Sequence, residues 1–520
     1  MPKTFFITTA IDYTNGAPHI GHAYEKILAD AIARYQRLSG REVFYLTGVD
    51  QHGQKVQQSA QQRGIDPAEF VDGITELFLA LWKKLDLKYD AWAATTSDVH
   101  KSCVQAILQR LWDEGKFYKA SQSGYYSVRQ EQFLTDKERG PDGEFGEEWG
   151  EVVLIEEENY YFKLAESRQW LLDLIDARTR SANPIVIPEF RVAELRNAVE
   201  KLSGDLCISR PKSRLTWGIE LPFDSDFVTY VWFDALVNYI SFAGYNATPG
   251  ADLTDFQAKW PAVHVIGKDI LIPPHGIYWP IMLHALGFTD EQIPALLVHG
   301  WWNIAGAKMS KSLGNIVDPS ALAEKYGCAA LRYYLLSDIT TGRDADFSNE
   351  RLIQRYNTDL ANSLGNLLNR TLNMAKRYRA GALRRMDSPL ADFTTEKAAT
   401  YKKQMEAFQL QAALESVMEI VIRCNAYVEE TAPWKLAKDP EQADKLDEVL
   451  YTLSEALRIV SILMTPIIPK EADAIRAQLN WTDPVSMEQS TWGLLPDGHV
   501  LGEPVPLFPR IEATPAESGA

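Results

Sequence analysis

The first fifty residues alternate between two hydrophobic patterns. Residues 3–13 (KTFFITTAIDY) carry the β-branched and aromatic side chains typical of a strand. Residues 23–38 place apolar side chains every three or four positions, which predicts a helix that ends at Gly40. Residues 42–50 (EVFYLTGVD) form a nearly continuous apolar run, as expected of a strand buried in a parallel sheet. Together they predict a βαβ unit, the beginning of a doubly wound, Rossmann-like sheet.

Three changes of pattern divide the rest of the chain. From about Lys116, short β-like pieces separated by turn residues, such as 151–164 and 183–190, predict mainly antiparallel strands. The alternation of strands and helices returns near Phe227. From about Glu350, glycine becomes rarer and long stretches with helical spacing predict a helical bundle.

We therefore expect an α/β fold: a doubly wound parallel nucleotide-binding sheet, interrupted by an inserted β-rich domain and followed by an α-helical bundle. The predicted segments are 1–115 and 227–325 for the two halves of the Rossmann-like domain, 116–226 for the inserted connective domain, 326–349 for a connecting region, 350–510 for the helical domain and 511–520 for a flexible tail.

The composition is that of an ordinary globular protein, with 520 residues, 46% hydrophobic and 24% charged, and a net charge of −17. The N-terminus lacks the apolar run of a signal peptide, and no stretch reaches the roughly 18 consecutive apolar residues that a membrane-spanning helix needs. The four cysteines are scattered, which argues against a disulfide framework or a cysteine zinc site. We expect a cytoplasmic protein that does not bind nucleic acid through overall positive charge.

Two histidines mark the turn between the first strand and the first helix. Residues 18–24 read PHIGHAY, which puts His19 and His22 towards one side of the helix start, with Gly21 between them. Helix N-termini attract anions because backbone N–H groups and the positive end of the helix dipole face outward there. By spacing alone the pair is more often a structural cap than an anion site, and least often a pair of metal ligands, since Glu25 does not complete a zinc site. The spacing alone leaves these alternatives open.

A second motif, AKMSKSLGN at residues 307–315, favours phosphate binding. Lys308 and Lys311 carry mobile positive charges suited to phosphate oxygens. Glycines on both sides would let the loop close over a substrate and reopen. A bare pair of lysines at this spacing is usually a solvated basic turn, but KMSKS followed by LGN is far less common by chance.

These two motifs, in this order and separated by an antiparallel insertion, resemble those of the class I aminoacyl-tRNA synthetases. The finer similarity is to the methionyl-tRNA synthetases and extends to about Pro509. Besides Ile11, Tyr13 and the HIGH-type stretch, it rests on VDQHG at 49–53, YVWFDALVNY at 230–239, IGKDIL at 266–271, YWPIML at 278–283 and APW at 432–434.

The resemblance implies a methionine–tRNA ligase that uses ATP with Mg²⁺ and charges initiator and elongator tRNA(Met). The methionine carboxylate would attack the α-phosphate of ATP, giving methionyl-adenylate and pyrophosphate, and the 3′-terminal ribose of the tRNA would then accept the methionyl group. A carboxylate is already nucleophilic, so this chemistry needs positioning and charge stabilisation rather than a catalytic base. The alternatives are a class I ligase for another amino acid, such as leucine or cysteine, and a noncatalytic tRNA-binding paralogue.

The resemblance also implies which residues form the site. The catalytic donors to phosphate would be His19, His22, Lys308 and Lys311, and ATP would also contact Gly21, Lys268, Asp269, Met309, Ser310 and Ser312. Methionine would lie against Ala10, Ile11, Tyr13, Asp50, Trp232, Ala235, Tyr239 and His275, with Asp50 receiving its ammonium group. Aromatic walls suit a polarisable thioether, although ordinary core packing explains the small apolar members equally well.

The chain departs from the family's pattern at three places. After GKDIL it has IPPHGIYWP, with one extra residue, which affects the register of His275. Residue 12 is acidic, and the sequence offers no reason for Asp12. Ser127 and Gln130 stand where many relatives begin a CxxC zinc knuckle, so we expect no structural zinc and no other resident metal.

In the helical domain, NLLNR and APW match the positions with which the family reads the anticodon. Asn366 would contact a base edge, Arg370 would offer a planar set of donors, and Trp434, presented by Pro433, would stack on an unpaired base. A tryptophan at the end of a bundle helix is usually a core residue, so this prediction depends on the match as a whole. Residues 326–349 would contact the tRNA stem. Some relatives dimerise through an extra oligonucleotide-binding domain that is not found here, so we expect a monomer.

Overall fold

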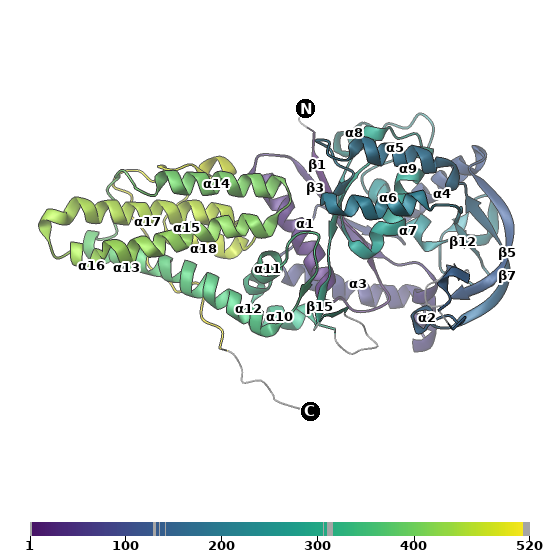
Figure 1. Cartoon of the computed structure of the whole chain (residues 1–520), viewed down its shortest axis with the longest axis horizontal. Coiled ribbons are helices and arrows are strands. Elements are labelled where there is room, and N and C mark those ends of the chain that lie inside the picture. The colour runs from purple at the N-terminus through teal and green to yellow at the C-terminus, as the bar shows by residue number, and fades with distance from the viewer. Residues whose placement is uncertain are drawn as a thin grey trace, which may run out of the picture.

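The computed structural model describes residues 3–127, 132–134, 136–140, 142–304, 306–308 and 316–512. Within these ranges the chain is elongated, with an α/β part at one end and a bundle of long helices at the other (Figure 1). Helices α1 (Ile20–Leu38) and α11 (Cys328–Ser337) lie where the two parts meet (Figure 1) and pack on each other.

A parallel sheet forms the centre of the α/β part. Its strands are ordered β2-β3-β1-β13-β14-β8, and β4 pairs with the other edge of β3. Every ladder among these strands is parallel. The bounds are Phe5–Thr9 for β1, Asp12–Tyr13 for β2, Val43–Asp50 for β3, Ala91–Ala94 for β4, Val186–Ile187 for β8, Val263–Gly267 for β13 and Ala295–His299 for β14. The predicted doubly wound sheet is confirmed, with β1 and β3 at the predicted positions.

Successive side chains of these strands point to opposite faces of the sheet and enter two different hydrophobic cores. Ile7 and Tyr45 belong to a core that continues through α1 and α11 into the helical bundle. Their neighbours Phe6 and Leu46 belong to a second core, on the other face. That second core is formed with α4 (Asp98–Asp113), α5 (Arg168–Arg178), α6 (Val192–Glu200), α7 (Val231–Ser241) and α9 (Trp279–Ala285).

The insertion is built on an antiparallel sheet. Its order is β6-β5-β7-β9, and the long strands β5 (Phe117–Ser127) and β7 (Val152–Phe162) pair along their full length. The short strands are β6 (Gln132–Leu134) and β9 (Leu206–Cys207), and a further antiparallel sheet contains β10 (Ser209–Pro211), β11 (Glu220–Leu221) and β12 (Asp224–Thr229).

One strand of this region was predicted wrongly. Residues 183–190 suggested an antiparallel strand of the insertion, but Val186 and Ile187 form β8, which pairs in parallel with β14 at the edge of the central sheet. Ile185 and Val186 are buried in the second core. The isolated apolar run does not show which sheet it joins, because a short buried strand looks the same in either direction.

From α10 to α18 the chain is mainly helical, as predicted for the part after about Glu350. The helices are α10 (Pro319–Tyr326), α11, α12 (Asn349–Arg355), α13 (Asn366–Arg379), α14 (Ala391–Glu406), α15 (Leu410–Thr431), α16 (Pro433–Leu436), α17 (Ala443–Met464) and α18 (Pro469–Gln478), and the π-helical stretch Tyr356–Gly365 joins α12 to α13. After α18 the chain returns along the bundle. Phe508 is buried there, and the backbone of Ile511 bonds the Asn357 side chain through both its N–H and its C=O.

Candidate active site

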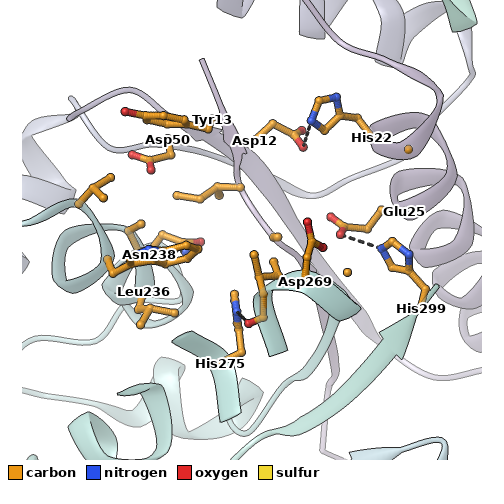
Figure 2. A pocket seen from close by; sticks show the side chains of 18 of the residues that line it. Asp12, Tyr13, His22, Glu25, Asp50, Leu236, Asn238, Asp269, His275 and His299 are labelled. Atoms are coloured by element: carbon orange, nitrogen blue, oxygen red, sulfur yellow. Dashed lines mark hydrogen bonds and ion pairs between the residues drawn. The ribbon is translucent and has the colours of Figure 1, made fainter. Parts of the chain in front are cut away.

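A cavity of about 580 Å³ opens where β1, β3, β13 and β14 end, beside the N-termini of α1 and α7 (Figure 2). Doubly wound sheets bind ligands at the carboxyl ends of their strands. The cavity brings together most of the residues predicted from the sequence. These are Ala10, Ile11, Tyr13, His19, Gly21, His22, Asp50, Trp232, Ala235, Tyr239, Asp269 and His275.

The backbone at the start of α1 fixes where the protons of the two histidines lie. His19 is the N-cap residue, and its Nδ1 accepts a hydrogen bond from the backbone N–H of Gly21 (3.1 Å). The backbone N–H of His19 in turn donates to Nδ1 of His22 (3.1 Å). Because both Nδ1 atoms act as acceptors, each neutral ring carries its proton on Nε2. The two rings stack at 3.8 Å, and both residues line the cavity.

Gly21 makes room for this arrangement. A Cβ atom at position 21 would lie 2.9 Å from Cε1 of His19, closer than such atoms normally approach. The imidazole of His19 therefore folds back over the helix start only because residue 21 has no side chain.

The apolar end of the cavity contains a tyrosine–histidine pair. The Tyr239 hydroxyl lies 2.7 Å from Nε2 of His275, and Nδ1 of His275 lies 2.9 Å from the Ile270 carbonyl. A carbonyl only accepts, so the proton of His275 is on Nδ1 and Nε2 accepts from the tyrosine. Burial lowers the pKa of His275 to about 4, which keeps the ring neutral at physiological pH. Trp232 completes this end, with its ring 6.3 Å from that of His275.

The extra residue after GKDIL does not displace His275. The helical stretch Leu271–Tyr278 is interrupted by a kink at Ile272, whose φ of −119° and ψ of 127° are not helical. His275 is 2% exposed and lines the cavity. The side chain thus reaches the position expected for it despite the changed register.

Asp50 stands at the end of β3, opposite Tyr13 in the β2–β3 register, and both residues line the cavity. Asp50 is buried, and one of its oxygens lies 3.4 Å from the backbone nitrogen of His52. The carboxylate therefore faces the cavity from the same strand end that the sequence indicated.

Behind α7, an unpredicted buried network supports the wall of the cavity. The two oxygens of Asp234 bond His52 and His100, each at 2.7 Å. Burial alone would raise the pKa of Asp234, but the two histidines lower it to about 2, so the carboxylate stays ionised. Both motifs, VDQHG and YVWFDA, were visible in the sequence, but nothing in either one indicates that His52 and Asp234 meet.

The acidic residue at position 12 has a partner that the sequence analysis missed. Nζ of Lys26 donates to Oδ1 of Asp12 at 2.5 Å, and both side chains are buried. Burial raises the pKa of Asp12 to about 7, against the lowering effect of Lys26. Nε2 of His22 lies 4.0 Å from the same Asp12 oxygen (Figure 2).

The predicted ATP-binding loops are only partly brought to the cavity. Asp269 lines it and accepts from Nε1 of Trp301 at 3.2 Å. Lys268 does not line it, because its ammonium bonds Asp344 at 2.5 Å and lies over the Trp301 ring. The backbone of Lys308 forms β16 (Ala307–Lys308), which pairs with β15 (Trp302–Ile304). Met309, Ser310, Lys311 and Ser312 lie outside the described residues.

The predicted anticodon-reading residues gather at the far end of the bundle, where α13 and α16 meet (Figure 1). Asn366 is exposed at the start of α13, and Arg370 follows one turn later. Arg370 donates to Glu429 at 2.7 Å and faces the ring of Trp434 at 5.7 Å. Trp434 is 37% exposed, and the preceding Pro433 is buried. A tryptophan of the core would be buried. This ring is partly exposed beside an arginine and offers a surface on which an unpaired base can stack.

Two further observations concern metals and membranes. Among the residues that the structure describes, no three His, Cys, Asp or Glu side chains gather so that they could hold a metal ion. Ser127 donates to the Trp149 carbonyl at 2.5 Å, and Gln130 lies outside the described residues. None of the helices in the described ranges is long and apolar enough to cross a membrane.

Comparison with known proteins places this geometry in a family. Residues 5–144 and 149–372 match the family described as tRNA synthetases class I (M), and residues 379–518 match the anticodon binding domain of methionyl tRNA ligase. The methionine–tRNA ligase of Deinococcus radiodurans is 42% identical over 98% of this chain and 75% of its own length. That of Bacillus subtilis is 41% identical over 98% of this chain and 78% of its own length.

Solved structures support the same family assignment. Mycobacterium tuberculosis methionyl-tRNA synthetase in complex with methionyl-adenylate is 36% identical, superposes with a TM-score of 0.90, and covers 98% of this chain and 100% of its own. The apo form of the same enzyme gives a TM-score of 0.83 at 33% identity, over 98% of this chain and 99% of its own.

Proposed function

The chain belongs to the methionyl-tRNA synthetases of class I, and we propose that methionine is activated in the cavity at the start of α1 and transferred there to tRNA. The chain is a methionine–tRNA ligase. It joins L-methionine to tRNA(Met) at the expense of ATP, through methionyl-adenylate. The assignment of individual residues within that reaction is our proposal.

The apolar end of the cavity would hold the methionine side chain. Its thioether would lie between Trp232, Ala235 and Tyr239, with Ala10 and Ile11 closing the other side. Aromatic rings interact favourably with a polarisable sulfur atom. His275 would be held neutral beside the sulfur by burial and by its two hydrogen bonds, so no charge would have to be desolvated when the thioether enters.

Asp50 would receive the methionine ammonium at the end of β3, with Tyr13 beside it. An ionised carboxylate in a buried wall discriminates strongly for a cationic amine. With its side chain in the apolar pocket and its ammonium group at Asp50, the methionine would direct its carboxylate towards the start of α1, where the histidines lie.

His19 and His22 would stabilise the transition state at the α-phosphate. Each presents an Nε2–H donor that the backbone has already oriented, so little reorganisation is needed as negative charge develops. Gly21 would let the nucleotide approach the helix start. Lys308 and Lys311 would add mobile positive charges from the KMSKS loop, with Met309, Ser310 and Ser312 contacting ATP.

Mg²⁺ would enter with ATP, since this ion is usually held by one or two carboxylates together with phosphate oxygens. Asp269 is one of the carboxylates that line the cavity. Lys268 would contact ATP only after exchanging its bond to Asp344 for one to the nucleotide. The prediction that the insertion holds no structural zinc stays a prediction, which metal analysis of the purified chain tests: about one equivalent of zinc would contradict it.

The second step would use the opposite end of the molecule for recognition. The anticodon of initiator and elongator tRNA(Met) would be read by Asn366, Arg370, Pro433 and Trp434, and residues 326–349 would lie along the tRNA stem. Because one chain carries both the cavity and these residues, we propose that it works as a monomer in the cytoplasm, where ATP and tRNA are available. Sedimentation should then give a single species of 58.6 kDa.

The observation that carries this assignment is the convergence, in one cavity, of two oriented imidazole donors with an aromatic pocket and the Asp50 carboxylate. We would mix the purified chain with ATP, Mg²⁺ and labelled methionine without tRNA, and look for methionyl-adenylate. Adding a tRNA(Met) transcript should consume the adenylate and give methionyl-tRNA. Adenylate that forms but is never transferred would contradict the second step, and no adenylate would contradict both.

A further inference from the structure

Lys26 is a fully buried ammonium group immediately under the cavity. Its side chain is 0% exposed, and its three protons have three acceptors: the Ala10 carbonyl at 2.9 Å, Oδ1 of Asp12 at 2.5 Å and Oε1 of Glu25 at 2.9 Å. Burial alone would lower the pKa of Lys26, but Asp12 and Glu25 hold it above its ordinary value, so the group stays charged. A buried charge is retained only with such partners, because desolvation is costly.

The three acceptors belong to different walls of the cavity. Ala10 follows β1 and lies at the end assigned to methionine, and its own N–H donates to the Val265 carbonyl on β13. Asp12 begins β2, beside His22. Glu25 lies on α1. Lys26 itself does not line the cavity, whereas all three of its partners do.

Glu25 extends these contacts to the ATP side. Its second oxygen lies 3.0 Å from Nε2 of His299, at the end of β14 (Figure 2). Nδ1 of His299 lies 2.7 Å from the Gly300 carbonyl, so each ring nitrogen lies within hydrogen-bonding distance of an oxygen atom. Lys26 and Glu25 thus connect the methionine-side backbone at Ala10 with the strand end that carries His299. We call Asp12, Glu25, Lys26 and His299 the buried charge cluster.

We propose that Lys26 is a positioning residue for adenylate formation: through the buried charge cluster it holds the methionine-side and ATP-side walls at a fixed separation, so that the two bound substrates are aligned for attack. The proposal rests on the function assigned above. A shift of an ångström between reacting atoms costs about 10²-fold in rate. A mobile Ala10 segment would therefore slow the chemical step more than it weakens either substrate.

A purely structural alternative is that Lys26 only neutralises Asp12. Removing one partner of a buried pair leaves an uncompensated charge, whereas removing both is often tolerated. The double variant Asp12→Asn/Lys26→Met separates the two explanations, because it removes one negative and one positive charge but also removes the tie to Ala10. Lys84→Met is the control: Lys84 bonds Ser320 (2.6 Å) and Glu324 (2.5 Å) near the surface, and, unlike the three acceptors of Lys26, neither of these partners lines the cavity.

The test compares binding with chemistry in the full-length chain. We would measure the Kd of methionine, the Kd of ATP, and the single-turnover rate of adenylate formation with both substrates saturating. For the double variant we expect each Kd to change less than about threefold and the rate to fall at least about 30-fold. The Lys84→Met protein should match the wild type in all three measurements.

Glu25→Gln provides a second, nearly isosteric variant in case the double variant does not fold. It interrupts the connection to His299 while Lys26 still reaches Ala10 and Asp12, and it should lower the single-turnover rate about tenfold with both Kd values kept. A wild-type rate in the folded double variant, or in Glu25→Gln, would overturn the proposal. So would a loss that appears in Kd alone. Failure of the wild-type chain to form methionyl-adenylate would instead contradict the function itself.

Discussion

The backbone places the protons of His19 and His22. Each Nδ1 accepts an N–H from the first turn of α1, so both rings direct Nε2–H away from the helix. The same two side chains therefore cap the helix through Nδ1 and offer the proposed phosphate donors at Nε2. Two of the alternatives that the sequence left open, capping and anion binding, thus do not compete, because capping orients the rings for the proposed anion.

Removing one of these donors should slow activation without weakening methionine binding. For His22→Ala we expect kcat of ATP–pyrophosphate exchange to fall by about 10²–10³-fold, about 3–4 kcal/mol, as for other oriented donors to a developing anion. KM for methionine should stay within about threefold, since the histidine lies at the phosphate end. His284→Ala, which removes a half-buried imidazole stacked on Trp170 outside the cavity, is the control and should leave kcat unchanged.

His275 should make stability depend on pH in the acid range. Its pKa is about 4 in the folded chain, against 6.5 ordinarily, so between these values the unfolded chain binds more protons. The free energy of unfolding should therefore fall as pH drops from 6.5 to 4, by about 3 kcal/mol from this residue. Urea titrations of the wild type and of His275→Gln at several pH values test this, because the glutamine side chain takes up no proton in this range. Parallel pH profiles of the two proteins would contradict it.

Helix α11 is the element that joins the bundle to the α/β part. Arg332 on this helix is 1% exposed and donates to the carbonyls of Ile467 (2.7 Å) and Leu85 (3.1 Å) and to the carboxylate of Asp30 on α1 (2.7 Å). One guanidinium thus contacts the bundle, the C-cap residue of α3 (Pro67–Lys84), and the helix that carries the histidines. Its planar set of donors matches these acceptors in a way that a lysine cannot.

Replacing this arginine should destabilise the chain strongly. Arg332→Met leaves Asp30 with only Arg34 as a charged partner, and we expect a loss of about 3–5 kcal/mol in the free energy of unfolding. Arg351→Met breaks an ion pair with Asp338 whose arginine side chain is 59% exposed, and should cost less than about 1 kcal/mol. Thermal and urea unfolding compare the two variants. Equal losses would show that Arg332 does not join the parts in the way described.

Across the whole molecule, the cavity lies in the α/β part and the predicted anticodon-reading residues lie in the helical bundle, so the two proposed functions should be separable by mutation. Trp434→Ala should lower kcat/KM for tRNA(Met) charging by about 10–100-fold, the equivalent of one lost stacked base. ATP–pyrophosphate exchange, which needs no tRNA, should be unchanged in the same preparation. Loss of exchange as well would indicate that Trp434 supports the fold rather than contacting RNA.

Much of this arrangement could be predicted from the sequence, and what could not be predicted has a common cause. Hydrophobic periodicity was sufficient for β1, α1, β3 and the long bundle helices, because each pattern is local. The position of β8, the meeting of Asp234 with His52, and the pairing of Asp12 with Lys26 depend on contacts between distant segments. His275 lines the cavity although a kink at Ile272 interrupts the helical stretch that carries it, and a linear register does not reveal such a kink.

The most direct test of the account is ATP–pyrophosphate exchange by the purified wild-type chain, with methionine, leucine and cysteine supplied separately. The pocket formed by Trp232, Tyr239 and neutral His275 predicts exchange that depends on methionine, with leucine and cysteine lower by at least about 10²-fold in kcat/KM. Exchange driven equally well by leucine or cysteine, or no exchange with methionine, would contradict the assignment of this cavity to methionine activation.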